Sequence, residues 1–279
     1  MNLSMEWNRD ALLQSPLFAP LHPVISRLNA DHFPTLDELN ALLDAHPHAI
    51  AVQNGSKLRF VAQGVGRLAF EAQYEPRCYL TGEVQTRQDN WHDLLNALVW
   101  LTYPSAKAAI NTRHYHALTN HAAERESSSQ RGTVRDTNTL LDESGVIVAY
   151  ADDELAGLLR DFQWTELFWQ RRERVKTSMG YYLFGHGLYE KALQPYIGMT
   201  GQGLLLAVTQ DFFSWPQAQQ SAHLDTRLAD YLADPENCRT TRELSPVPLL
   251  GVPGWSADNN CMSYYKNSDY FRPGRRKGC

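Results

Sequence analysis

Residues 91–118 constrain the fold more than any other part of the sequence and read WHDLLNALVWLTYPSAKAAINTRHYHAL. The first half, up to Tyr103, is apolar on nearly all sides, and a helix with that pattern is normally buried. Pro104 then changes the direction of the chain, because proline disrupts the interior of a helix, and Ser105 can cap a second helix. The sequence therefore predicts a helical hairpin over residues 91–123, with its first helix in the core.

Polar side chains interrupt both predicted helices. Asn96 lies within the apolar helix, on the same side as His92. One stripe of the second helix carries Lys107, Asn111 and His114. A buried amide without a partner costs ~1–3 kcal/mol, so pairing of Asn96 with Asn111 would satisfy both amides. The polar set either locks the two helices together or lines a cleft that binds substrate, and both interpretations remain open.

Two pairs of a histidine and an acid are the candidates for catalysis. FGHGLYEK places His186 and Glu190 on one helical face, where they can bind a metal, form a carboxylate-oriented general base, or form a surface pair. Asp93 follows His92 directly and either caps the helix, orients a histidine or binds a metal. A catalytic zinc would need a third ligand, for which His92, Asp93 and His114 are the nearest candidates by motif. The sequence identifies no cofactor, and the HExxH motif is absent.

Gly185 and Gly187 flank the histidine of this motif, within a helix that the pattern predicts over residues 181–193. Glycine destabilises the interior of a helix. We therefore expect another backbone or a ligand to approach closely at these positions.

The segment RGTVRDTNTLLDESG carries a second group of charges. Arg131 and Arg135 can bind a phosphate or carboxylate group of a substrate. Arg135 and Asp136 can equally join a buried network of ion pairs. The end of the segment, with Gly145 free to adopt positive φ, predicts a β-hairpin over residues 138–150.

Helical and strand-like segments do not alternate regularly along the chain. Short strands are predicted at 58–60, 67–70 and 203–208, between longer helical segments. A regular alternation would predict a doubly wound α/β fold, so the pattern favours an α+β fold that is mainly helical.

Composition limits the class of protein. The chain has 279 residues, 43% of them hydrophobic, which is enough for one globular domain over residues 1–279, with residues 233–279 as a mostly irregular tail. Its net charge of -5 argues against a general nucleic-acid binder. No apolar segment reaches the ~20 residues of a membrane span. No signal peptide is recognisable and the cysteines show no CxxC spacing, so we expect a cytoplasmic protein with reduced thiols.

The C-terminal segment MSYYKNSDYFRPGRRK interleaves aromatic and basic residues. Aromatic rings beside cations can stack on single-stranded nucleic acid, although such rings more often pack against the body of the protein. The Walker A, GxGxxG and GxSxG motifs are absent.

Four segments together resemble a bacterial family known as domain of unknown function 3025. They are NWHDLLNALVWLTYPSAKAAIN, RGTVRDTNTLLDESG, FGHGLYEK, and PLLGVPGW with YFRP. The resemblance extends from about residue 50 to the end of the chain. It implies no activity, because the family has none assigned, but it implies that these segments are the signature of the family.

Two hypotheses for function follow from the sequence. The first is a hydrolase-like enzyme, with or without a metal, in which His92, Asp93, His186 and Glu190 are catalytic and Lys107, Arg131 and Arg135 hold an anionic substrate. The second is a non-catalytic module that binds a protein or single-stranded nucleic acid through the aromatic and basic C-terminal segment.

Overall fold

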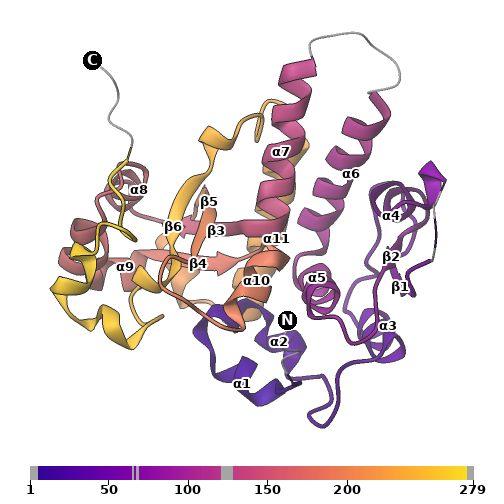
Figure 1. The fold of residues 1–279 in the computed structure, drawn as a ribbon, viewed down its shortest axis with the longest axis horizontal. Helices are drawn as coiled ribbons and strands as arrows, with labels where there is room; N and C mark the ends of the chain where they lie inside the picture. The colour runs from indigo at the N-terminus through magenta and orange to yellow at the C-terminus, as the bar shows by residue number, and fades with distance from the viewer. Residues whose placement is uncertain (1–5, 65, 67–68, 121–127, 275–279) are drawn as a thin grey trace.

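The computed structural model describes residues 6–64, 66, 69–120 and 128–274. Over these residues the chain is mainly helical, with one sheet of four strands and one of two (Figure 1). The prediction of an α+β fold is therefore confirmed. The elements follow in the order α1 (Arg9–Gln14), η1 (Pro16–Leu21), α2 (His22–Ile25), α3 (Leu36–Asp44), β1 (Arg59–Val61), η2 (Phe70–Ala72), α4 (Tyr74–Thr81), β2 (Glu83–Gln85), α5 (Trp91–Thr102), α6 (Pro104–Asn120), α7 (Ser128–Ser144), β3 (Gly145–Tyr150), α8 (Asp153–Arg160), η3 (Glu166–Gln170), α9 (Arg172–Ser178), β4 (Met179–Leu183), α10 (His186–Ala192), β5 (Thr200–Ala207), η4 (Gln210–Ser214), α11 (Gln217–Ala233), η5 (Thr241–Glu243), β6 (Ser245–Pro248), η6 (Leu249–Gly251), η7 (Ala257–Asn260) and η8 (Met262–Lys266).

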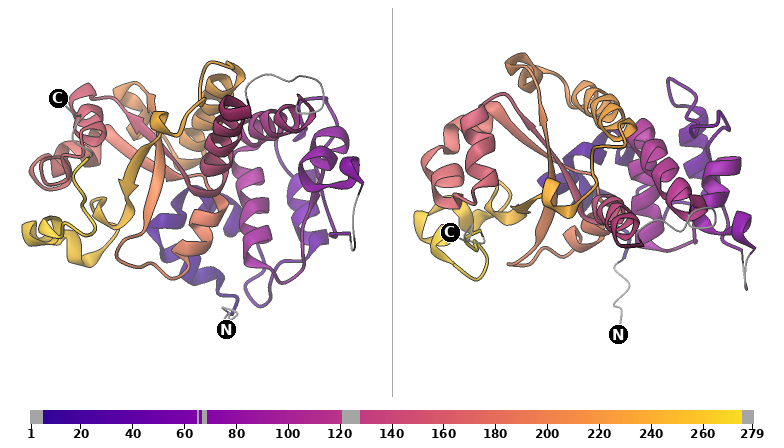
Figure 2. Two further views of the ribbon diagram at one scale, coloured as in Figure 1. Left: turned by 45° about the horizontal axis from the view of Figure 1, so that its top comes forward. Right: turned by 90° about the horizontal axis from the view of Figure 1, so that it is seen from above.

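The four-stranded sheet has the order β4-β3-β5-β6. Strand β3 pairs parallel with β5 and antiparallel with β4, and β5 pairs antiparallel with β6. Helices α8 and α9 lie on one side of this sheet, and α7 and α11 lie on the other (Figure 2). Strand β3 is buried almost throughout, as expected for an inner strand covered on both faces.

The two helices of the opening segment form as predicted. Helix α5 is buried over Leu94–Leu101 because it is apolar on all sides, and Pro104 begins α6 after a single intervening residue. Figure 1 shows α5 nearly end-on while α6 runs beside α7, so α5 and α6 diverge steeply and do not lie side by side. The polar stripes of the two helices therefore do not face each other along their length.

The predicted β-hairpin over 138–150 is wrong in its first half. Residues up to Ser144 belong to helix α7, and only the second half is a strand, β3. Thr137, Asn138 and Leu141 are buried at helical spacing. The side chains of Thr137 and Asn138 also donate hydrogen bonds to the carbonyls four residues earlier, an arrangement that a helix provides.

The predicted helix over 181–193 is also only partly correct. Its aromatic first part, YYL, belongs to β4 and pairs with β3, and helix α10 begins at His186. Aromatic residues favour strands when they have a sheet to join. The histidine motif thus lies at the start of a helix.

The other expectations are mixed. The strands predicted at 58–60 and 203–208 correspond closely to β1 and β5. In the strand predicted at 67–70, residues 67–68 lie outside the described residues, and Phe70 begins the short helix η2. The segment 233–274, for which a mostly irregular tail is predicted, contains several short helical turns and contributes strand β6.

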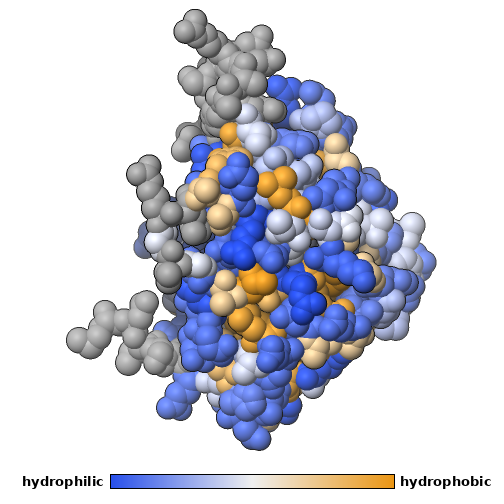
Figure 3. Space-filling model, turned by 90° about the vertical axis from the view of Figure 1, so that its right-hand side faces the viewer, coloured by the Kyte–Doolittle hydropathy of each residue, from blue (hydrophilic) through white to orange (hydrophobic). Residues whose placement is uncertain are grey.

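No helix in the described residues is both long and apolar enough to cross a membrane. On the face that carries α3 and α4, hydrophilic residues predominate and hydrophobic residues gather near the middle (Figure 3).

The two glycines of the histidine motif allow α10 to approach the end of α7. A Cβ atom on Gly185 would lie 2.4 Å from the backbone nitrogen of Ser144, and one on Gly187 would lie 2.4 Å from Oε2 of Glu143. The expected close approach of another backbone is confirmed.

We predict that Gly185→Ala lowers the free energy of unfolding by ~1–3 kcal/mol, because backbone atoms must move to accommodate the methyl group. Gly157→Ala in α8 is the matched control. A Cβ there would meet nothing within 4 Å, so the helix should gain up to ~1 kcal/mol. Urea-induced unfolding of both variants measures the difference, and equal effects would contradict the close approach.

Candidate metal centre

Three side chains from three helices converge at one point. His92 comes from α5, Glu143 from the end of α7, and His186 from the start of α10. Each offers one ligand atom, and these atoms all lie within 4.8 Å of one another. The Nε2 atoms of His92 and His186 are 3.0 Å apart, and Oε1 of Glu143 is 3.6 Å from Nε2 of His186. Two histidines and one carboxylate are a common ligand set for catalytic zinc.

A second layer of carboxylates lies behind the two imidazole rings. Oε2 of Glu190 is 2.9 Å from Nδ1 of His92, and Oδ2 of Asp142 is 3.8 Å from Nδ1 of His186. Lys107 in turn donates a hydrogen bond of 2.5 Å to Oδ1 of Asp142. Histidine ligands of metals usually donate their other N–H to such a carboxylate, which fixes the ring and the tautomer.

Burial and charge set the protonation states of this centre. Burial lowers the pKa of His186 to about 3, so the ring is neutral near pH 7, as a metal ligand requires. Burial alone would raise the pKa of Asp142, but the positive charge of Lys107 lowers it to about 2. Burial raises the pKa of Glu143.

The residues fit a bound cation in one further respect. When Nδ1 of a neutral His92 donates to Glu190, its Nε2 carries a lone pair. Nδ1 of His186 is buried and has no hydrogen-bond partner among the described residues. If that Nδ1 carries the proton, on the side of Asp142, then Nε2 of His186 has a lone pair, and this lone pair points toward Nε2 of His92. Zinc bonds imidazole nitrogen at about 2.0–2.1 Å, so nitrogens 3.0 Å apart can share one ion.

The centre opens into a polar cleft of about 410 Å³. Residues of helix α4 and strand β2 also line this cleft. Among the described residues, the only Lys or Arg on the lining is Arg87, whose guanidinium group and backbone N–H bind Asp93. Asp93 thus fixes the loop before α5, where Asn90 caps the helix by accepting from the N–H of Asp93.

Asn96 and Asn111 are buried as predicted, but they do not bind each other. Asn96 donates to the hydroxyl of Tyr74 at 2.6 Å, and Asn111 donates to the carboxylate of Glu75 at 2.5 Å. Helix α4 therefore lies between the two amides and supplies the partner of each. This correction follows from the steep divergence of α5 and α6. Burial also raises the pKa of Glu75.

The other predicted substrate-binding residues are dispersed. His114 and Arg135 line a smaller cavity of about 130 Å³, which shares Glu75, Asp142 and Glu143 with the cleft. Lys107 is buried against Asp142 and does not line the cleft. Asp136 is exposed on α7 and lines neither cavity. The side chain of Arg131 lies outside the described residues.

The aromatic residues of the C-terminal segment pack inward. Tyr265, Tyr270 and Phe271 are buried. The hydroxyl of Tyr265 donates to the carbonyl of Gly251, and that of Tyr270 donates to the carbonyl of Met199. These three rings are not free to stack on a ligand at the surface. Arg275, Arg276 and Lys277 lie outside the described residues.

Sequence reasoning did not assign Glu143 or Asp142 to the centre. The β-hairpin predicted over 138–150 puts both acids at its turn, whereas the structure places them in the last turn of α7. The sequence does carry a signal for this helix, because Thr137 and Leu141 are four residues apart and two adjacent acids follow them.

A family model matches residues 58–275 and bears the description "Protein of unknown function (DUF3025)". The chain belongs to this family. No curated protein and no solved structure matches the chain at a significant level. The family match includes every residue of the metal centre described above.

We predict that Lys107→Met lowers the free energy of unfolding by ~3–5 kcal/mol, because it leaves the carboxylate of Asp142 buried without its partner. The side chain of Lys107 is only 4% exposed. The matched control is Arg239→Met, which removes an ion pair with Glu236 at the surface and should cost less than ~1 kcal/mol. Denaturant unfolding tests both variants, and a cost for Lys107→Met no larger than the control would argue against the buried pair.

Proposed function

We propose that this protein is a metal-dependent hydrolase whose divalent cation is held by His92, His186 and Glu143. The observation that carries the proposal is the convergence of the two Nε2 atoms and one carboxylate, with a further carboxylate behind each ring. Three protein ligands leave a coordination position open, which distinguishes catalytic from structural zinc sites.

Each residue of the centre has a definite task in this proposal. A bound cation would supply Lewis-acid activation of water and of the bond to be cleaved. Glu190 accepts the Nδ1 proton of His92 and so directs Nε2 of that ring toward the cation. The carboxylate of Asp142, held by Lys107, lies 3.8 Å from Nδ1 of His186, where its negative charge favours a proton on that nitrogen and a lone pair on Nε2. Both arrangements exist before substrate binds, which lowers the reorganisation needed during the reaction.

The charged residues of the cleft and of the adjoining cavity indicate which charge the substrate carries. Arg87 is already bound to Asp93, and Lys107 to Asp142, so neither is free to bind an anion. Arg135 is exposed at the smaller cavity and has no ion-pair partner within the part of the chain that the structure describes, so it can bind a negatively charged group. An anionic substrate is therefore supported by Arg135 together with the charge of the cation.

We predict that protein purified without a histidine tag contains about one equivalent of zinc, manganese or iron. His186→Ala should lower the content far below one equivalent, because it removes a ligand. Glu190→Gln keeps all three ligands but weakens the orientation of His92, so affinity should fall ~10–100-fold. Elemental analysis and competition with a chelator measure both effects.

The control is His116→Ala, which removes an exposed histidine of α6 outside the centre and should leave the metal content unchanged. Metal-free wild-type protein whose melting temperature does not respond to added zinc, manganese or iron(II) would refute the metal centre.

We further predict hydrolysis of a chromogenic carboxylic or phosphate ester by the metal-loaded protein. A chelator should abolish this activity, added metal should restore it, and His186→Ala should reduce it to the level of the chelated protein. The same ligand set also binds iron(II) in oxygenases. Stoichiometric iron with oxygen consumption and no ester hydrolysis would therefore contradict the hydrolase while retaining the metal centre.

A further inference from the structure

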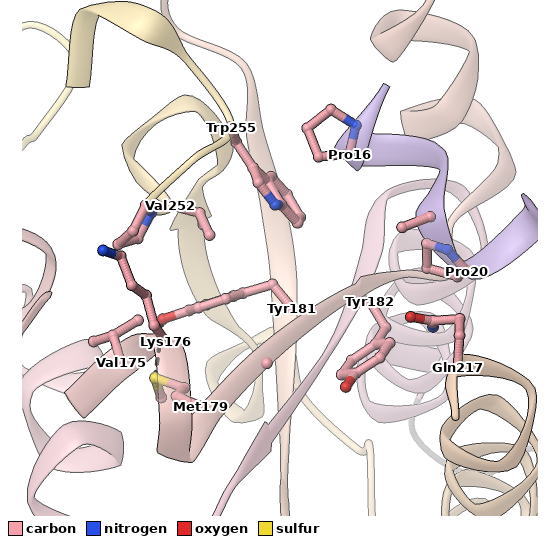
Figure 4. Close-up of a pocket in the computed structure, with 13 residues that line it drawn as sticks. Pro16, Pro20, Val175, Lys176, Met179, Tyr181, Tyr182, Gln217, Val252 and Trp255 are labelled. Carbon is pink, nitrogen blue, oxygen red and sulfur yellow. Dashed lines mark hydrogen bonds between the residues drawn. The ribbon is translucent and has the colours of Figure 1, made fainter. Parts of the chain in front are cut away.

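A second pocket, of about 310 Å³, lies along strand β4 and shares no lining residue with the metal centre or its cleft (Figure 4). Tyr181 and Trp255 form an aromatic wall, with ring centroids 6.3 Å apart. Pro16 and Pro20 of η1 lie on the opposite side. Lys176 lies toward one end of the pocket in Figure 4.

The pocket lies against the outer edge of β4. Strand β4 is at the end of the sheet order β4-β3-β5-β6, so one of its edges has no neighbouring strand. Four consecutive residues, 179–182, line the pocket. Because side chains of consecutive strand residues project to opposite faces, a cavity that meets all four lies at the edge of the strand.

The hydrogen bonds between β3 and β4 show which backbone groups face outward. Ala151 N–H donates to the carbonyl of Ser178, and Phe184 N–H donates to the carbonyl of Gly145. The residues on the β4 side of both bonds are even-numbered. Hydrogen-bonded and non-hydrogen-bonded residues alternate along an antiparallel pair. The odd-numbered residues of β4 therefore direct their N–H and C=O groups toward the outer edge.

Tyr181 is the odd-numbered residue in the middle of β4. One outward group at each end has a partner: Met179 N–H donates to the carbonyl of Val175, and the carbonyl of Leu183 accepts from the hydroxyl of Tyr189. Within the described residues no hydrogen bond reaches the N–H or the C=O of Tyr181. The prolines across the pocket have no N–H to offer.

We propose that this pocket binds a small planar molecule that carries a hydrogen-bond acceptor beside a donor, as nucleobases and aromatic amides do. The acceptor would take the N–H of Tyr181 and the donor would bind its C=O. The ring would lie among the apolar walls of Trp255 and the two prolines. An extended peptide is a poorer match, because a volume of about 310 Å³ suits a single small molecule.

This proposal does not depend on the metal centre. Its test uses the full-length protein and four probes: 9-methyladenine, benzamide, and the N,N-dimethyl analogue of each, which keeps the ring but has no N–H donor. Dissociation constants are measured by ligand-observed NMR titration. We expect 9-methyladenine or benzamide to bind saturably, and its dimethyl analogue to bind at least ~10-fold more weakly. Binding of 9-methyladenine alone identifies a nucleobase, and binding of benzamide alone identifies an aromatic amide.

Two variants locate the binding. Trp255→Ala removes the aromatic wall and should weaken the bound probe by about tenfold. Trp169→Ala removes a partly buried tryptophan that does not line the pocket and should leave the affinity unchanged. Circular dichroism verifies that both variants are folded. The proposal is overturned if neither parent probe saturates, if the dimethyl analogues bind equally well, or if Trp169→Ala weakens binding as much as Trp255→Ala.

Discussion

The candidate metal centre depends on the buried ion pair between Lys107 and Asp142. It connects α6 to the last turn of α7, and it places a carboxylate behind the ring of His186. A buried pair of this kind contributes little net stability compared with apolar packing, but it determines which groups must meet. In this chain it fixes the end of α7. That end carries Glu143 and leads directly into strand β3.

The contact between α10 and α7 complements that pair. Glycine at 185 and 187 lets the backbone of one helix reach the other, so that a histidine and a carboxylate from separate helices share one point in space. Larger side chains at these positions would separate the helices and, with them, the ligands. The geometry of the proposed centre therefore depends on two residues without side chains.

Much of the fold could be predicted from local patterns. The apolar helix, the break at Pro104 and the role of the paired glycines all follow from properties of a few neighbouring residues. His92, His186 and Glu190 could be named for the same reason. The errors arose where tertiary contacts decide: YYL joins a sheet whose other strand lies some thirty residues earlier, and α4 separates Asn96 from Asn111. Glu143 falls at the turn of the predicted β-hairpin, whereas in the structure it belongs to the end of a helix.

The wide separation of the three proposed ligands along the chain has a thermodynamic consequence. His92, Glu143 and His186 belong to helices that are distant in sequence, and they meet only when the chain has folded. A cation held by all three would bind the native chain and scarcely the unfolded one. Its supply would then act by mass action on the folding equilibrium, adding ~2.7 kcal/mol at a free concentration a hundred times the dissociation constant. The amount of folded protein in a cell would in this way report the availability of the ion.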